Sequence, residues 1–297
     1  MRRRKPMLIP IKSANARTLS IVAALCLALV GWCAADADPA ASLASASALD
    51  RGFRGLYNLD FTGAQHDFAG WEAQHPDDPV GPASEAAGVL FSEFNRLGIL
   101  EAQFYVNDAE FSARSKLAPD PAAKDRFQSA INRAQSLGRA RLAKDPKDRD
   151  GLFALTLSAG LEADYAALIE KRNLPSLHYT KEASAWAEQL LAICNDCDDV
   201  RVATGFSKYI IGSMAAPVRW MLRLGGLAGD KKDGIADLQQ TAAHGHYLAP
   251  FARILLAIAY VREKDRPRAL QLLAGLRAEF PGNPLFSREM ARLETTK

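Results

Sequence analysis

The stretch from Pro250 to Asn283 has the clearest pattern in this 297-residue chain, and it constrains the fold most strongly. Two segments with apolar residues at helical spacing are joined by the polar turn 263–265. Ala257 and Ala269 place small side chains where two antiparallel helices must approach closely. Pro281 stops the second segment, because proline cannot continue a helix. The pattern predicts a helical hairpin and an all-α fold.

With Pro250 as position one, this hairpin resembles a tetratricopeptide repeat (TPR), a 34-residue helix-turn-helix unit. The family's structural positions are matched at seven, eight, eleven, twenty and thirty-two by Leu256, Ala257, Tyr260, Ala269 and Pro281. The sequence departs from the family at positions four and twenty-seven. The family often has Trp and Ala there, and this chain has Arg253 and Leu276.

A second TPR-like frame lies near the start of the predicted helical domain, residues 48–297. Its positions eight, twenty, twenty-four and thirty-two are occupied by Gly52, Ala64, Phe68 and Pro76. The small packing positions between the two frames are unevenly spaced, which excludes a strict 34-residue period. We therefore expect a right-handed α-solenoid of TPR-like hairpins with irregular repeat lengths.

The second half of the chain is similar to a group of exported bacterial TPR proteins. That group is related to the tetratricopeptide-repeat 39 and inclusion-body-clearance family of eukaryotes. The segments that carry the similarity are 205–209, 217–219, 224–226, 229–230, 234–235, 245–248 and 280–286. The resemblance implies an all-helical interaction scaffold and brings no catalytic residues with it.

Residues 1–35 have the features of a signal peptide. Six basic residues and no acid accompany the 14-residue apolar run 19–32, which is short for a transmembrane helix. Small residues predict cleavage after Ala35 or Ala37, followed by a disordered spacer at 36–47. The alternative is an uncleaved membrane tether through 19–32. Both interpretations predict an exported protein, periplasmic or associated with the cell envelope.

The basic character of the chain belongs to this first segment. The whole sequence has 37 basic and 34 acidic residues, and removing residues 1–35 leaves 31 basic and 34 acidic, a net charge of −3. Nucleic-acid binding needs a clustered basic face, so we expect no nucleic-acid partner.

Cys194 and Cys197 are the only cysteines after residue 35. In an oxidising compartment, two cysteines three residues apart at a helix end are expected to form a structural disulfide. Free thiols are the main alternative. A redox-active pair would need a strand-to-helix setting, and a zinc site would need a second pair of ligands.

No contiguous catalytic, phosphate-binding or dinucleotide-binding motif is present, so no catalytic residue, metal or cofactor is predicted. In TPR arrays the first helix of each hairpin lines the concave face. That resemblance makes candidate binding residues of Phe251, Ile254, Ile258, Val261 and Arg262. The alternative for their apolar members is packing under the C-terminal helix. Trp220, in the apolar segment 217–224, is a further candidate that suits a core equally well.

These observations favour a non-catalytic scaffold that binds a protein or peptide partner. One alternative is a helical carrier of an apolar small molecule or lipid, and another is an enzyme with a noncontiguous site. An open groove would favour the scaffold, and a closed apolar cavity the carrier. A buried cluster of His, Asp and Glu would favour the enzyme.

Overall fold

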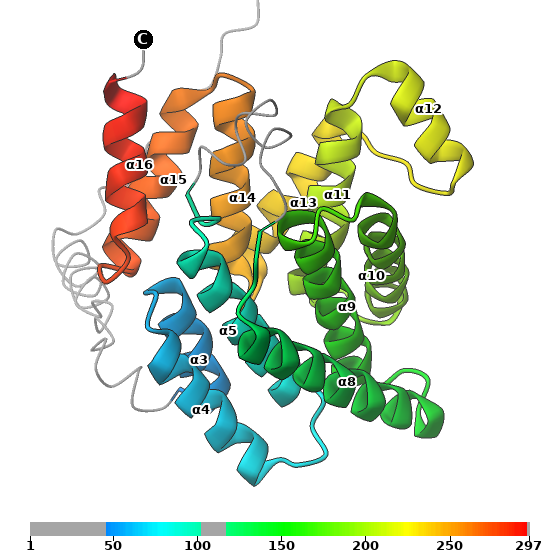
Figure 1. Ribbon diagram of the computed structural model, residues 1–297. Helices are drawn as coiled ribbons and strands as arrows, with labels where there is room; N and C mark the ends of the chain where they lie inside the picture. Colours follow the sequence, from blue (N-terminus) through cyan, green and yellow to red (C-terminus); the bar gives the residue numbers. More distant parts are fainter. Residues whose placement is uncertain (1–45, 102–116, 296–297) are drawn as a thin grey trace, which may run out of the picture. The chain divides into compact units, whose positions relative to one another are not determined.

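Figure 1 shows the computed structural model, which describes residues 46–101 and 117–295. Twelve α-helices and no strand occur among these residues, so the all-α prediction is confirmed. The helices are α3 (Ala48–Tyr57), α4 (Phe61–Gln74), α5 (Val80–Arg96), α8 (Pro121–Lys144), α9 (Arg149–Asp164), α10 (Asn173–Ile193), α11 (Arg201–Ser213), α12 (Ala216–Leu224), α13 (Lys231–His244), α14 (Ala249–Arg262), α15 (Arg266–Glu279) and α16 (Pro284–Thr295). A π-helical turn (Tyr165–Ile169) extends α9, and a 3₁₀ turn (Asp198–Val200) precedes α11.

The predicted signal peptide or tether, residues 1–35, lies outside the described residues. So does the predicted spacer, except for its last two residues, 46 and 47. Ser47 is the N-cap of α3 and forms a reciprocal capping box with Asp50. The ordered helical unit therefore includes Ser47, one residue before the predicted boundary.

Aspartate side chains start many of the helices. Each accepts a hydrogen bond from a backbone N–H in the first turn of its helix, which would otherwise have no partner. The residues that do this are Asp60, Asp120, Asp148, Asp230 and Asp265. The chain thus begins these helices with the same local chemistry, although their spacing along the sequence is uneven.

The helices pack as consecutive antiparallel pairs: α3 with α4, α5 with α8, α9 with α10, α11 with α13, and α14 with α15. The second helix of each pair also packs on the first helix of the next pair, and α16 packs on α15. The first helices α3, α5, α9, α11 and α14 contact one another in sequence. The helix α12 belongs to the connection between the two helices of the fourth pair and projects away from them (Figure 1).

The structure places the predicted repeat positions at the helix contacts. Ala64 and Phe68 have no exposed surface, and a Cβ added to Gly52 would lie 2.2 Å from the Phe68 ring. Ala269 is also fully buried. In the last hairpin the other repeat positions are buried as well: Leu256, Ala257 and Tyr260. The helices α4 and α15 end at Gln74 and Glu279, two residues before Pro76 and Pro281.

The first hairpin also packs against the segments that flank the last one, before α14 and after α15. Tyr57 on α3 donates a hydrogen bond from its hydroxyl to the Tyr247 carbonyl at 2.8 Å, and its own carbonyl accepts from Asn283 Nδ2 at 2.9 Å. Its ring lies 5.3 Å from that of Phe280. Repeats of an open solenoid contact only their sequence neighbours. These contacts, about 190 to 226 residues apart, depart from that arrangement.

Within the described residues, one helical stretch is long and apolar enough to cross a membrane by composition. It is Arg149–Ile169, which comprises α9 and the π turn. In the structure 67% of its apolar window is buried, and α9 packs between α8, α10 and α5. Its burial is that of a core helix.

Candidate functional site

A surface hollow, called the larger hollow below, lies between α13, α14 and α15 and has a volume of about 440 Å³. Its apolar lining comes from all three helices: Ala242, Ala243, Leu256, Leu272 and Gly275. Its polar lining consists of two amides, two guanidinium groups and a phenol: Gln239, Gln271, Arg253, Arg268 and Tyr260. The volume is within the range of ligand-binding clefts.

Tyr260 organises the polar side of this hollow. Gln239 Nε2 on α13 donates to its hydroxyl at 2.9 Å, and the Arg268 guanidinium lies over its ring, 5.0 Å from the centroid. Arg253 pairs through Nη2 with Glu279 at 2.6 Å. The Arg253 Nε atom is buried and has no hydrogen-bond partner among the described residues. The exposed polar side chains of the hollow include the amides of Gln239 and Gln271.

A smaller hollow of about 280 Å³ lies between the end of α4, the start of α5 and α8. Arg133 lies within it, 2.7 Å from Glu72 and 2.5 Å from Glu85. Burial raises the pKa of Glu72, while the Arg133 charge works in the opposite direction. The charged groups of this hollow are already paired with one another, so it offers less to a ligand.

The predicted first-helix binding residues pack against other helices instead of lining an open groove. Phe251 meets Phe91 of α5 edge-to-face, with ring centroids 5.6 Å apart. Ile258 is buried, and Ile254 and Val261 pack half-buried against the same core cluster. The remaining candidate, Arg262, is half-buried. Partner binding by these five residues stays a prediction.

Trp220 is not a core residue. It lies on α12 with 66% of its surface exposed, beside the exposed Met221 and Leu224. Of the two interpretations of the segment 217–224, the structure favours the exposed apolar surface. Leu222 is the one half-buried residue of this helix.

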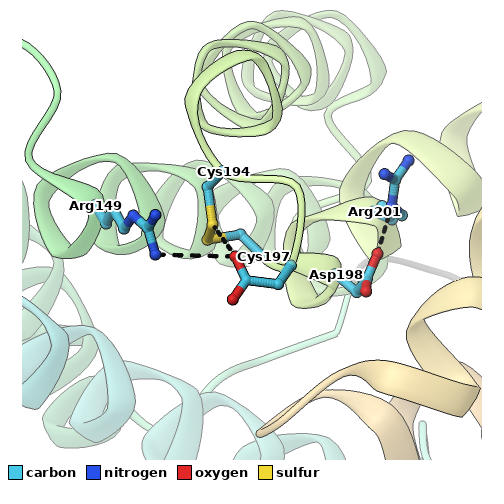
Figure 2. Close-up of a disulfide and its surroundings, with 6 residues drawn as sticks. Arg149, Cys194, Cys197, Asp198 and Arg201 are labelled. Carbon is cyan, nitrogen blue, oxygen red and sulfur yellow. Dashed lines mark hydrogen bonds and ion pairs between the residues drawn. A yellow bond between two sulfur atoms is a disulfide. The ribbon is translucent and has the colours of Figure 1, made fainter.

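Figure 2 shows the disulfide between Cys194 and Cys197 at the end of α10, with Cα atoms 5.5 Å apart. Cys194 is buried against Leu152 and Val200, so the bond joins the α10 terminus to the core. Arg201 Nε lies 2.7 Å from the Asp198 carboxylate just beyond the bond (Figure 2). The disulfide holds the turn from which α11 starts.

Judged by distance alone, Asp196 and the two cysteine sulfurs lie close enough together to be ligands of one metal ion. Sulfurs joined in a disulfide are not available as metal ligands, because a thiolate is the ligating form. With the pair reduced, three donors on one short turn would still lack the fourth protein ligand of a structural zinc site.

Asp199, just after the disulfide, holds the segment that connects α13 to α14. Its two oxygens accept hydrogen bonds from the Tyr247 and Leu248 backbone N–H groups at 3.0 and 2.9 Å. Burial raises the pKa of Asp199, and these backbone hydrogen bonds work in the opposite direction. Gly245 has no room for a side chain, since a Cβ would lie 2.6 Å from Asp199 Oδ1.

The same segment brings together the histidine and acids that an enzyme site would need. His246 Nε2 lies 2.5 Å from Asp50, and the Tyr247 ring stacks on Phe53 at 4.8 Å. Partial burial opposes ionisation of Asp50, but hydrogen bonds from His246 and Ser47 outweigh it and lower its pKa. Burial and nearby carboxylates raise the pKa of Tyr247 to about 12. The carboxylates here cap backbone groups, which is a structural role.

Sequence reasoning missed most of the residues that line the larger hollow. Arg253 and Tyr260 lie in the hairpin with the clearest pattern, but only Tyr260 was placed at a repeat position. The signal for Arg253 was its departure from the family, which often has Trp at that position. A charged residue where the TPR pattern often has a large apolar one indicates that this position does not serve core packing here.

No protein-family model matches the chain, and no curated protein matches it significantly.

Proposed function

We propose that the chain is an exported, TPR-like helical scaffold that binds a protein or peptide partner in the hollow between α13, α14 and α15. Support for a TPR-like array comes from the consecutive helix pairs and from the chain of contacts between their first helices. The small residues Gly52, Ala64 and Ala269 at the helix contacts are a second support.

The observation that carries the binding proposal is the composition of the larger hollow. Its guanidinium and amide groups are hydrogen-bond donors, and they stand around an apolar floor. Backbone carbonyls and carboxylates of an extended peptide accept such bonds, and apolar peptide side chains fit the floor. Both hollows are open to solvent and carry charged side chains, which favours a scaffold over a carrier with an enclosed apolar cavity.

Site-specific photo-cross-linking tests this site. Gly275 lines the hollow, and a Cβ built there meets nothing within 4 Å, so a photoreactive residue at this position should leave the fold intact. Gly70 on α4 is equally open and lies outside the hollow, which makes it the matched control. Irradiation of native envelope material should cross-link a specific polypeptide at Gly275 and not at Gly70. Identical products from both positions would contradict the proposed site.

Export is tested separately by N-terminal sequencing of the protein from the envelope fraction. Cleavage of the signal peptide should leave a mature chain that starts at Asp36 or Asp38. A chain that starts at Met1 would contradict cleavage and favour the tether through residues 19–32.

A further inference from the structure

The helix α12 presents the most exposed apolar surface among the described residues. Among all the described residues, five large apolar side chains are exposed, and four of them belong to this nine-residue helix. They are Val218, Trp220, Met221 and Leu224, with exposed fractions of 39%, 66%, 61% and 70%. Large apolar side chains gathered on one exposed element mark an interaction site.

The helix is amphipathic. At about 100° per residue, Trp220, Leu224 and Met221 fall within an arc of about 100°. Arg223 lies about 60° beyond Trp220 and Arg219 about 40° further round, so both arginines flank this arc on its Trp220 side. Both arginines are exposed. The apolar stripe therefore has a cationic edge.

The connection between α11 and α13, which carries α12 and is called the arm here, is held at both ends. Arg219 Nη1 donates to the Gly212 carbonyl at the end of α11, 3.1 Å away. Lys181 Nζ on α10 donates to the Gly225 carbonyl at 3.3 Å. Gly226 takes φ of +83°, a left-handed conformation that glycine adopts without strain, and this directs the chain back toward α13. Figure 1 shows α12 set apart from the neighbouring helices.

The stretch of sequence that contains α12 has no acidic residue. No Asp or Glu occurs from residue 200 to 229, and the basic residues of this stretch are Arg201, Lys208, Arg219 and Arg223. An apolar face with Trp, edged by arginines and free of acids, is the composition of helices that lie in the headgroup region of a bilayer. Nine residues give a helix of about 13 Å, which suits lying on the surface and not crossing it.

We propose that α12 docks this protein on an anionic lipid surface, with Trp220, Met221 and Leu224 inserted between the headgroups and Arg219 and Arg223 paired with lipid phosphates. The proposal stands independently of the peptide-binding hollow, which is built by other helices. It also adds a membrane contact from the helical unit itself, separate from residues 19–32.

The test is hydrogen–deuterium exchange of the full chain with vesicles of phosphatidylcholine and phosphatidylglycerol, compared with vesicles of phosphatidylcholine alone. Amides of 216–224 should gain protection with the anionic vesicles and much less with the neutral ones. The readout is local to α12, so binding through residues 1–45 does not produce it. A difference spectrum between the chain and Trp220→Phe should show Trp220 emission moving to shorter wavelength.

Two variants and one control measure the contributions of the arginines and of the apolar side chains. Arg223→Gln should weaken vesicle protection of α12 about fivefold, since each basic residue near an anionic surface contributes about 1 kcal/mol. Arg277→Gln on α15 removes an exposed arginine outside the arm and should leave that protection unchanged. Trp220→Ser combined with Leu224→Ser should remove it, because both side chains lose their apolar transfer energy.

Unchanged exchange at 216–224 with anionic vesicles overturns the proposal. Equal protection by neutral vesicles overturns the role given to the arginines. Protection of 216–224 by a protein from the envelope, without protection by vesicles, would assign α12 to a protein partner and also overturn the proposal.

Discussion

Single carboxyl groups in this protein differ sharply in how their charge is compensated. Asp199 is buried, and its two oxygens accept hydrogen bonds from the Tyr247 and Leu248 backbone amides. Asp164, near the end of α9, has no hydrogen bond or ion pair among the described residues, and burial alone raises its pKa to about 7. A carboxyl of this kind favours folding only while it is protonated.

Stability should therefore depend on pH through Asp164. Between about pH 4 and 7 the folded state holds a proton that the unfolded state has lost, so the free energy of unfolding falls as pH rises through this window. A shift of about three units corresponds to about 4 kcal/mol as an upper limit, and partial exposure of the side chain reduces this to roughly 1–2 kcal/mol.

Asp164→Asn should remove this loss, making the variant more stable than the parent at pH 8 and similar to it at pH 4. Urea unfolding at a series of pH values measures the difference. Asp77→Asn, in an exposed turn, is the control and should follow the parent. Parallel stability curves for parent and Asp164→Asn would contradict the assignment.

The disulfide is a residue-scale feature with local consequences. The loop that it closes is only three residues long in sequence separation, so the stabilisation expected from restricting the unfolded chain is under about 3 kcal/mol. Protein recovered from the envelope fraction and unfolded without reductant should resist alkylation at Cys194 and Cys197. Mass spectrometry measures this, and two alkylated cysteines would show free thiols.

Reduction of the same protein should raise hydrogen exchange at 198–200 and at Tyr247 and Leu248, which depend on Asp199. The distant α3–α4 pair should keep its protection. Global loss of protection on reduction would show that the bond supports far more than this turn.

At the scale of the helices, some glycines lie where two helices touch and others lie on open surface. A Cβ on Gly234 in α13 would lie 2.5 Å from the Tyr209 nitrogen and 2.6 Å from the Gly205 carbonyl, both in α11. The two backbones are therefore in direct contact at this crossing. Gly275 in α15 has nothing within 4 Å of the same position.

Alanine at these two sites should have opposite effects. Gly234→Ala should destabilise the protein by about 1–3 kcal/mol, because α11 and α13 must move apart. Gly275→Ala should stabilise it by about 0.5–1 kcal/mol, since glycine costs that much in a helix interior. Thermal unfolding of both variants compares them directly. A stabilising Gly234→Ala would mean that the α11–α13 crossing is looser than described.

At the scale of the whole helical unit, the sequence predicted the features that depend on local pattern. Helical spacing, small packing residues and a proline stop define the 250–283 hairpin, and three-residue spacing was enough to suggest the Cys194–Cys197 bond. The contact between Tyr57 and Asn283 joins residues 226 apart, and no periodicity encodes it. Exposure of Trp220 was equally undetermined, because the same apolar residues suit a core or a surface.

The donors of the larger hollow were hidden for a related reason. They come from three helices, and Gln239 and Gln271 look like ordinary solvated residues until α13 and α15 are placed on either side of α14. The first-helix face, which family resemblance marked for binding, is occupied by packing such as that of Phe251 on Phe91. Tertiary contacts decided both outcomes.

The contact between the first and last hairpins should couple their stabilities. Asn283 is buried and has two roles: its Nδ2 donates to the Tyr57 carbonyl, and its Oδ1 accepts from the Leu285 N–H at the start of α16. Asn283→Asp keeps the acceptor for Leu285 but loses the donor, so it isolates the contact with α3. An unpaired buried carbonyl facing a carboxylate should cost about 1–3 kcal/mol.

Hydrogen exchange should then rise in α3, more than 220 residues away in sequence, together with the end of α15. Asp265→Ala is the control, because it removes the cap of α15 without touching α3. Its effect should stay within the α14–α15 pair. If Asn283→Asp leaves exchange in α3 unchanged, the two hairpins are energetically independent, as they would be in an open array.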